Sequence, residues 1–241
     1  SRSVCDFAEA EGLDLSLVRR VDHPYRRVTT ALPLHGERAF VTFTDPDAPD
    51  LHDHWFRVIE DSEFKHLHIG SLDSLEQLQR LIDAARAQGA TVSIDCQDGP
   101  HLASPSEFLK RLSLVDIFMP NAREAKLLTG TTRVDAALER LSAMVNLVVL
   151  KNGKLGARAA RDGEVIHVPS IDAGKVVDTT GAGDCFNAGF LYGYIVERAP
   201  LDVCLRYGNI CGGLSVTSVG GATAAPKRDE LMAWAVNETA G

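Results

Sequence analysis

Short apolar runs alternate with segments of helical periodicity through the middle of the chain. The apolar runs predict strands at residues 66–70, 91–95, 115–119 and 147–150. Apolar positions spaced three or four apart predict helices at residues 74–88, 121–128 and 134–144, and Ser104-Pro105-Ser106-Glu107 is a capping box that predicts another helix start. Strands that alternate with helices connect through right-handed crossovers, so the pattern predicts an α/β fold, a mostly parallel sheet covered by helices on both faces.

The segments on either side of this alternation follow other patterns. Two β-rich runs, residues 29–33 and 39–44, predict a hairpin that is a candidate lid spanning about residues 24–44, and residues 44–53 predict a solvated loop. Residues 157–161 and 164–168, separated by Asp162-Gly163, predict a second hairpin. The chain ends with helices predicted at residues 182–197, 201–217 and 227–237.

Composition narrows the class of protein. The 241 residues are 45% hydrophobic and 24% charged, which is typical of a globular protein with one large domain or two small ones. A net charge of −8 argues against nucleic acid as a partner, and the longest nearly apolar run, residues 188–196, is too short to span a membrane. The five cysteines form no Cys-x-x-Cys pair, so we expect free thiols in a reducing, cytoplasmic compartment.

Residues 178–184, Asp-Thr-Thr-Gly-Ala-Gly-Asp, carry the clearest chemical signal. Glycines at the start of a helix let backbone amides converge on an anion, and Asp184 in the first turn suits a base that deprotonates an attacking hydroxyl. The alternative, of about equal weight from this segment alone, is a glycine turn followed by an aspartate that favours the helix dipole. The sequence contains neither a P-loop nor a dinucleotide-binding Gly-x-Gly-x-x-Gly.

Residues 178–190 closely resemble the second signature of the PfkB, or ribokinase-like, carbohydrate kinase family. The resemblance extends along nearly the whole chain. Residues 11–18 resemble the helix end before the lid, residues 36–38 the lid turn, residues 120–124 the Asn-x-x-Glu motif, residues 151–157 the nucleotide-side strand end, and residues 215–222 the loop over the adenine. It implies a single ribokinase-like domain over residues 1–241, with a doubly wound, mostly parallel sheet, flanking helices and a small β lid.

The resemblance also implies roles for particular residues. Asp184 would be the catalytic base, and the anion hole would be formed by Gly181, Ala182 and Gly183. Nucleotide binding would fall to Lys151, Gly153, Asn209 and Gly221, magnesium through water to Asn121 and Glu124, and a monovalent cation, potassium, to Asp178 and Thr180.

Two of these assignments have structural alternatives. Asn121 with Glu124 three residues later is also a plain capping box, and Asn209 is equally well a helix asparagine bonded to backbone. The histidine pairs 52 and 54, and 66 and 68, would each share one face of a strand, but no further ligand with clear spacing supports a metal site.

The implied function is ATP- and magnesium-dependent transfer of a phosphoryl group to a sugar hydroxyl. The alternatives are a nucleoside kinase of the same fold and a non-catalytic fragment that binds nucleotide or sugar. A homodimer through the lid is a candidate assembly. Residues 1–20 lack the family's paired glycines and substrate-binding aspartate, so we expect a fragment or a degenerate protein, with weak nucleotide binding, slow transfer and poor solubility when residues 1–241 stand alone.

Overall fold

The computed structural model describes residues 2–21, 26–34, 37–46, 50–70, 75–96 and 105–239. It divides into two compact units, which we call the N-terminal unit (Ser1–Ser62) and the C-terminal unit (Glu63–Gly241). The assignment of the whole chain to one domain stays a prediction.

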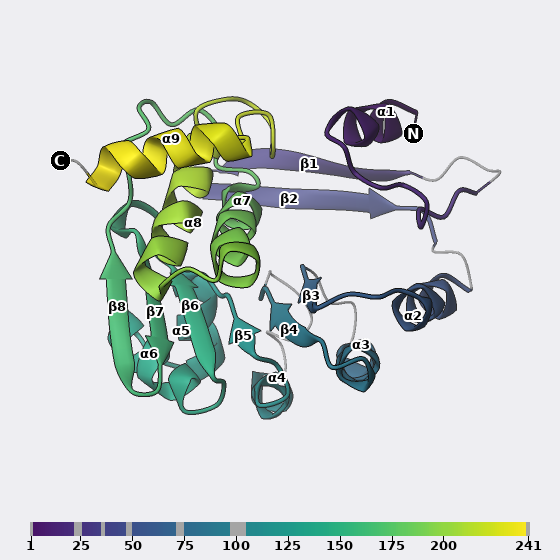
Figure 1. The fold of residues 1–241 in the computed structure, drawn as a ribbon, viewed down its shortest axis with the longest axis horizontal. Coiled ribbons are helices and arrows are strands. Elements are labelled where there is room, and N and C mark those ends of the chain that lie inside the picture. Colours follow the sequence, from purple (N-terminus) through teal and green to yellow (C-terminus); the bar gives the residue numbers. More distant parts are fainter. Residues whose placement is uncertain are drawn as a thin grey trace. The chain divides into compact units, whose positions relative to one another are not determined.

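The C-terminal unit is built on a six-stranded sheet in the order β3-β4-β5-β6-β7-β8 (Figure 1). Its strands are β3 (His66–Ile69), β4 (Thr91–Ile94), β5 (Ile117–Phe118), β6 (Leu147–Lys151), β7 (Ala157–Arg161) and β8 (Glu164–Val168). Neighbouring strands from β3 to β6 are parallel, and the β6–β7 and β7–β8 pairs are antiparallel. The mostly parallel sheet and the second hairpin are therefore confirmed.

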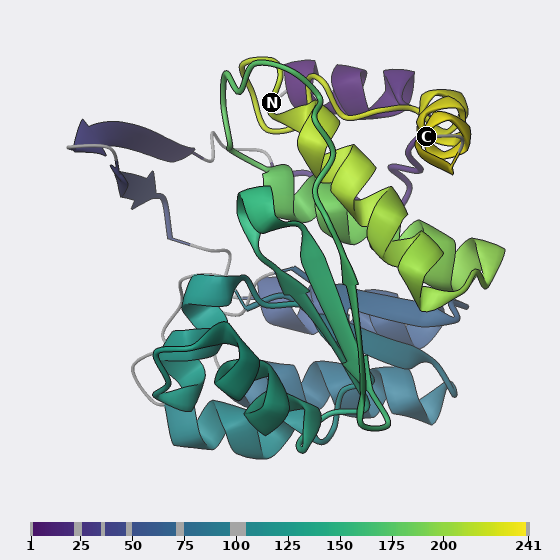
Figure 2. The same cartoon turned by 90° about the vertical axis from the view of Figure 1, so that its left-hand side faces the viewer.

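Helices cover both faces of this sheet (Figure 2). One face packs against α3 (Leu75–Ala87), α4 (Pro105–Leu112), α5 (Ala122–Thr129) and α6 (Val134–Ser142). The other packs against α7 (Ala182–Leu191) and α8 (Leu201–Ser215), and α9 (Arg228–Thr239) packs on α8. The helix predicted at residues 182–197 is α-helical only as far as Leu191 and continues as a π-helix, η3 (Tyr192–Glu197).

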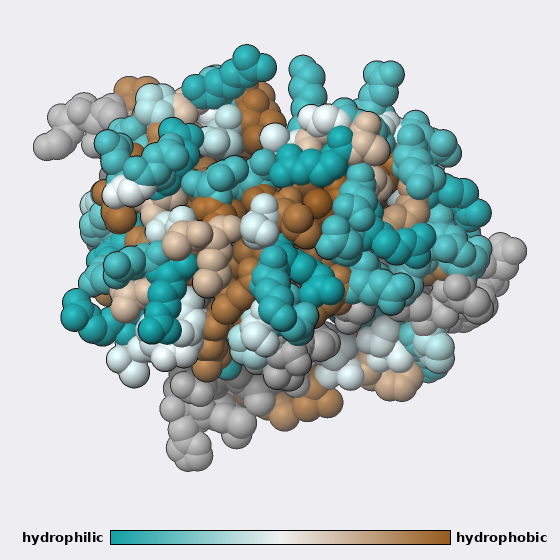
Figure 3. Space-filling view, turned by 90° about the horizontal axis from the view of Figure 1, so that it is seen from below, coloured by the Kyte–Doolittle hydropathy of each residue, from teal (hydrophilic) through white to brown (hydrophobic). Residues whose placement is uncertain are grey.

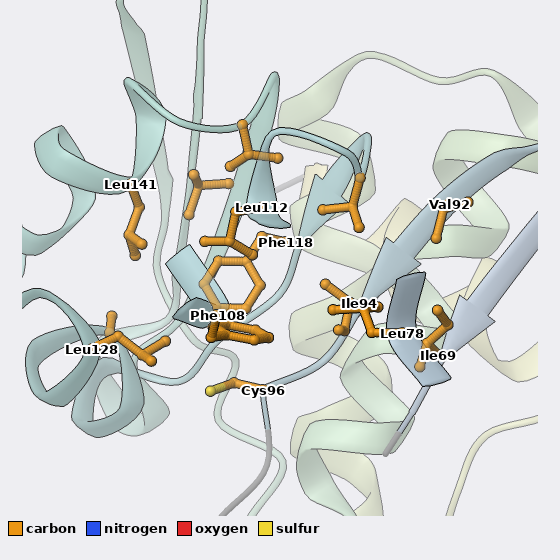
Figure 4. Close-up of a cluster of buried hydrophobic side chains, with 14 of the residues drawn as sticks. Ile69, Leu78, Val92, Ile94, Cys96, Phe108, Leu112, Phe118, Leu128 and Leu141 are labelled. Atoms are coloured by element: carbon orange, nitrogen blue, oxygen red, sulfur yellow. The ribbon is translucent and has the colours of Figure 1, made fainter. Parts of the chain in front are cut away.

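Strand β6 shows why the sheet needs two covers. Val148 and Leu150 lie in the core beneath α3 to α6, while Leu147 and Val149 lie in the core beneath α7 and α8. All four side chains are buried, so the strand appears in the sequence as a continuous apolar run. In the first core the rings of Phe108 and Phe118 meet edge to face, with centroids 5.7 Å apart (Figure 4).

Helices α7 and α8 approach closely because each presents glycine to the other. A Cβ on Gly189 would lie 2.6 Å from the carbonyl oxygen of Tyr207, and a Cβ on Gly208 would lie 2.7 Å from the ring of Phe186. A carbon at Gly189 would meet the backbone of α8, and a carbon at Gly208 would require the Phe186 ring or the helix to move.

The N-terminal unit holds α1 (Arg2–Ala10), the hairpin β1 (Arg27–Leu34) and β2 (Glu37–Thr44), and α2 (Leu51–Asp61). The predicted hairpin is confirmed, with Val28 opposite Phe43 and Thr30 opposite Val41. At its base the Arg26 guanidinium donates to both carboxylate oxygens of Asp45, at 2.9 and 3.0 Å. Its role as a lid stays a prediction.

Two elements of this unit differ from the predictions. The helix α2 begins at Leu51, inside the stretch predicted as loop, because charged residues and two histidines obscure the apolar spacing that buries Phe56. The start of α1 was also not predicted. The capping residue predicted at Ser104 and the lid turn at residues 35–36 lie outside the described residues.

The surface and the cysteines are consistent with a globular protein. Hydrophilic side chains cover most of the face seen in Figure 3, with hydrophobic ones between them. All five cysteines are free thiols, as predicted. Among the described residues, no helix combines the length and the apolar character that a membrane crossing requires.

Candidate active site

A cavity of about 770 Å³ opens in the C-terminal unit where the carboxyl ends of β4 and β6 face the start of α7. This is where ligands bind in open α/β sheets. Nine of the predicted site residues line it: Asn121, Glu124, Lys151, Gly153, Gly181, Ala182, Gly183, Asp184 and Asn209. Residues far apart in the sequence thus converge on one hollow.

The glycine turn at the start of α7 has a conformation that only glycine adopts without strain. Gly181 is the N-cap residue, with φ of 72°, and a Cβ there would lie 2.2 Å from the carbonyl oxygen of Gly221. The Ala182 amide donates to the Thr179 carbonyl at 3.4 Å, and the Gly183 and Asp184 amides that follow it have no backbone acceptor among the described residues. Amides of this kind at a helix start can bind an anion. Gly221 packs its backbone against Gly181 and is not among the residues that line the cavity. Its place in the nucleotide site stays a prediction.

Asp184 lies in the first turn of α7 and is exposed in the cavity. Its carboxylate makes no hydrogen bond or ion pair with any described residue, so both oxygens are available to a ligand. A carboxylate one turn from converging amides can accept a proton from a hydroxyl whose attacked group those amides hold.

Asp178 organises the loop that leads into the turn. One of its oxygens accepts hydrogen bonds from the backbone and the hydroxyl of Thr180, at 3.0 and 2.8 Å, and the other accepts one from the Gly220 amide at 3.1 Å. These bonds tie the segment before the turn to the loop after α8. A loop held in this way has backbone carbonyls in fixed positions, and the predicted cation site at Asp178 and Thr180 stays a prediction.

Asn121 and Glu124 form the capping box of α5. The Asn121 side chain accepts hydrogen bonds from the amides of Arg123 and Glu124, and the Glu124 carboxylate accepts one from the Asn121 amide at 2.7 Å. The capping box predicted as the structural alternative for this pair is therefore present. Both residues also line the cavity, and Glu124 is only 6% exposed. The capping bonds fix a nearly buried carboxylate at the cavity wall, so the two interpretations are compatible.

Lys151, at the end of β6, belongs to a buried polar cluster with two residues that sequence reasoning missed. Its ammonium donates to the Asp95 carboxylate at 2.7 Å and to the Asn187 side-chain oxygen at 3.2 Å. A usable signal existed for Asp95, because it ends a predicted strand parallel to the one that Lys151 ends, and such ends meet at one edge of the sheet. Asn187 lies on α7 three residues after Asp184, and its sequence context gave no signal.

The far part of the cavity is less polar. Gly153 begins a short 3₁₀ turn (Gly153–Leu155) at the cavity wall. The Asn209 side chain donates to the carbonyls of Val168 and Pro169, at 3.1 and 2.9 Å, so the backbone-bonded alternative is realised for this residue. Among apolar groups the cavity is lined by Ile171, Ala173, Val176, Phe186 and Val216. Such a wall suits a planar base more than a charged group.

The two histidine pairs lie on different kinds of element. His52 and His54 lie on helix α2 and not on a strand, so their spacing places them on different faces, which corrects the prediction for this pair. His66 and His68 do lie on β3, but both rings bond to the Ser93 hydroxyl, at 2.7 and 2.8 Å. Among the described residues, no group of three or more His, Cys, Asp or Glu side chains could hold a metal ion.

Burial controls the charge of these two rings. It lowers the pKa of His66 from 6.5 to about 4, with a further contribution from the neighbouring His68. It also lowers the pKa of His68, which the charge of Lys151 lowers further and the carboxylates of Asp95 and Asp184 oppose.

The sequence model of the pfkB family carbohydrate kinases matches residues 1–228 of this chain. The chain belongs to this family. PfkB enzymes are phosphotransferases with an alcohol group as acceptor, and the match confirms the resemblance found in the sequence.

Relatives within the pfkB family act on different acceptors. The chain is 30% identical to a fructokinase of Klebsiella pneumoniae over 245 residues, which covers 92% of this chain and 78% of the relative. Its fold resembles that of Vibrio cholerae O395 fructokinase in the form bound to fructose, ADP and calcium (TM-score 0.80, 24% identity, 96% of this chain and 80% of the other). It also resembles Burkholderia thailandensis nucleoside kinase in complex with inosine (TM-score 0.81, 21% identity, 99% and 77%). The comparisons therefore include kinases of both sugars and nucleosides with this fold.

Proposed function

We propose that this protein transfers the γ-phosphoryl group of ATP to a hydroxyl of a sugar. The observation that carries the proposal is the placement of Asp184 in the first turn of α7, beside the amides of the glycine turn and in a cavity of about 770 Å³. Its carboxylate is unpaired among the described residues. A base and an anion site side by side are what phosphoryl transfer to an alcohol requires.

The residues of the turn would act in one step. Asp184 orients the acceptor hydroxyl and takes its proton as the oxygen attacks the γ-phosphorus. The new oxygen–phosphorus bond forms while the bond to the β-phosphate oxygen breaks, and ADP leaves with that electron pair. The amides of residues 181–184 hold the charge on the phosphoryl oxygens, in a helix N-terminus whose dipole favours anions.

The cavity wall fits magnesium held through water. Glu124 offers one nearly buried carboxylate at the wall, and Mg²⁺ in kinases is bound by few protein ligands and several waters and phosphate oxygens. When bound, the ion would neutralise charge on the phosphates of ATP. Asn121 would hold the Glu124 carboxylate in place through its amide. For potassium, the ordered loop around Asp178 and Thr180 supports a site built from backbone carbonyls.

A fructokinase that is 30% identical over 92% of this chain favours a sugar over a nucleoside as acceptor. The nucleoside kinase alternative is supported by the similar fold of a kinase in complex with inosine. The intact arrangement of Asp184, the glycine turn and Glu124 argues against the third alternative, a binding protein without turnover. A homodimer through the hairpin of β1 and β2 remains our proposal for the assembly.

A panel of sugars and nucleosides tests the proposal through ADP release with the chain and with a version extended upstream. We expect transfer to one sugar, and we expect Asp184→Asn to reduce it on the order of 100-fold or more while ATP affinity stays within about threefold. Wild-type transfer by Asp184→Asn would refute the base assignment. Transfer to nucleosides alone would select the nucleoside kinase.

A further inference from the structure

Asp95, Lys151 and Asn187 form a closed triangle of hydrogen bonds beside the glycine turn. One Asp95 oxygen accepts from the Lys151 ammonium at 2.7 Å and from the Asn187 amide at 2.5 Å, and the Asn187 oxygen accepts from Lys151 at 3.2 Å. The other Asp95 oxygen accepts from the Cys96 amide at 2.7 Å. Each member therefore restrains the other two.

The cluster is buried, so it is expected to contribute little net stability to the fold. The Lys151 side chain is 12% exposed and that of Asp95 is 6% exposed. A buried ion pair loses the hydration of both charges, and apolar residues of similar volume often serve a fold equally well. The three residues come from the ends of two parallel strands and from the helix that carries Asp184, so what they fix is the position of a charge relative to that helix.

The position of the ammonium is next to the anion site. The Lys151 nitrogen lies 3.5 Å from the point that a Cβ on Gly183 would occupy. Lys151 and Asp95 line the same cavity as Gly183 and Asp184. An ammonium has three N–H groups, and two of those of Lys151 have partners among the described residues, which leaves one for a ligand.

We propose that Asp95 and Asn187 are positioning residues that hold the Lys151 ammonium against the glycine turn, where it stabilises the charge that develops on the transferring phosphoryl group. The inference rests on the proposed kinase function and deepens it. A lysine side chain is flexible, and the two acceptors remove that freedom before substrate arrives.

A double-mutant cycle tests the coupling. The variants are Asp95→Asn, Asn187→Leu, Lys151→Met and the double variant Asp95→Asn with Lys151→Met, each measured for kcat, for KM of ATP and acceptor, and for Tm. We expect each single variant to lower kcat about 10- to 100-fold and to change either KM by less than about fivefold, because the interaction strengthens in the transition state. In the Lys151→Met background, Asp95→Asn should change kcat by less than about threefold, because Asp95 acts through Lys151.

The double variant keeps the test decisive if a single variant unfolds. It contains no buried unpaired charge, so we expect it to fold with a Tm near that of the wild type and with the low kcat of Lys151→Met. A folded double variant with wild-type kcat would overturn the inference and show that the cluster is only structural. The wild type measured in parallel distinguishes failure of the proposed function from failure of this inference. If the wild type transfers phosphate to no acceptor, both are overturned. If the wild type is active and the double variant is equally active, only the inference is overturned.

Discussion

Replacing Gly181 by alanine should separate the geometry of the anion site from the stability of the fold. The added Cβ would lie 2.2 Å from the carbonyl oxygen of Gly221, where an ordinary contact is about 3.4 Å, so the turn and the facing loop must move apart by about 1 Å. The φ of 72° adds about 1 kcal/mol of strain for a residue with a side chain. Misplacement by about 1 Å at a site of chemistry can cost on the order of 100-fold in rate.

The chain supplies a matched control. Gly89, after α3, has the same φ of 72°, and a Cβ there meets nothing within 4 Å. We expect Gly89→Ala to lose about 1 kcal/mol in urea unfolding from the positive φ alone, and Gly181→Ala to lose more because its Cβ also meets the backbone of Gly221. Only Gly181→Ala should lose about 100-fold in kcat. Calorimetric titration with ADP should show weaker binding for Gly181→Ala alone. A kcat for Gly181→Ala within threefold of the wild type, or an equal loss in both variants, would refute the role of the turn.

Three further predictions follow from the site and the core. Glu124→Gln keeps an oxygen that can accept the Asn121 amide, so the half-saturating Mg²⁺ concentration should rise about tenfold while Tm hardly changes; a large Tm loss with unchanged Mg²⁺ dependence would leave Glu124 as a cap only. Because burial lowers the pKa of His66 to about 4, the unfolded chain binds its proton first as pH falls below 6.5, so the unfolding free energy should decrease between pH 6.5 and 4 by about 1–2 kcal/mol for this half-buried ring, and His66→Gln should flatten that decrease in urea titrations. Leu150→Ala, at 0% exposure, should cost about 2–5 kcal/mol in the same assay, whereas Leu155→Ala, at 67% exposure, should stay within about 0.5 kcal/mol; equal losses would contradict the assignment of the core.

The sheet was predictable because its strands carry a strong local signal. Residues 147–150 are apolar on both faces, which is typical of a buried parallel strand, and the structure places β6 there with all four side chains buried. The helix α2 was not predictable in the same way, since its buried side is narrow and its sequence is rich in charged residues and histidines. Local pattern specifies an element only where burial leaves a regular apolar spacing.

The site residues also differ in whether a local sequence pattern reveals them. The glycine turn and Asp184 lie within one continuous segment, so a motif could find them. Asp95 and Asn187 are 92 positions apart and become partners only when the sheet brings the end of β4 against α7. Lys151 was predicted from its motif, but the ion pair that holds it depends on tertiary packing, which a single sequence does not reveal.

The glycine contacts between α7 and α8 bear on how this protein can be re-engineered. Because a carbon at Gly189 or Gly208 would meet backbone or ring atoms at 2.6 to 2.7 Å, a saturation library should return glycine at both positions whatever acceptor is used for selection. The cavity wall around Ser170 and Asp172 lies outside that interface. Directed evolution of new ligand preferences should therefore diversify the wall and leave the two helices as the invariant frame that carries Asp184.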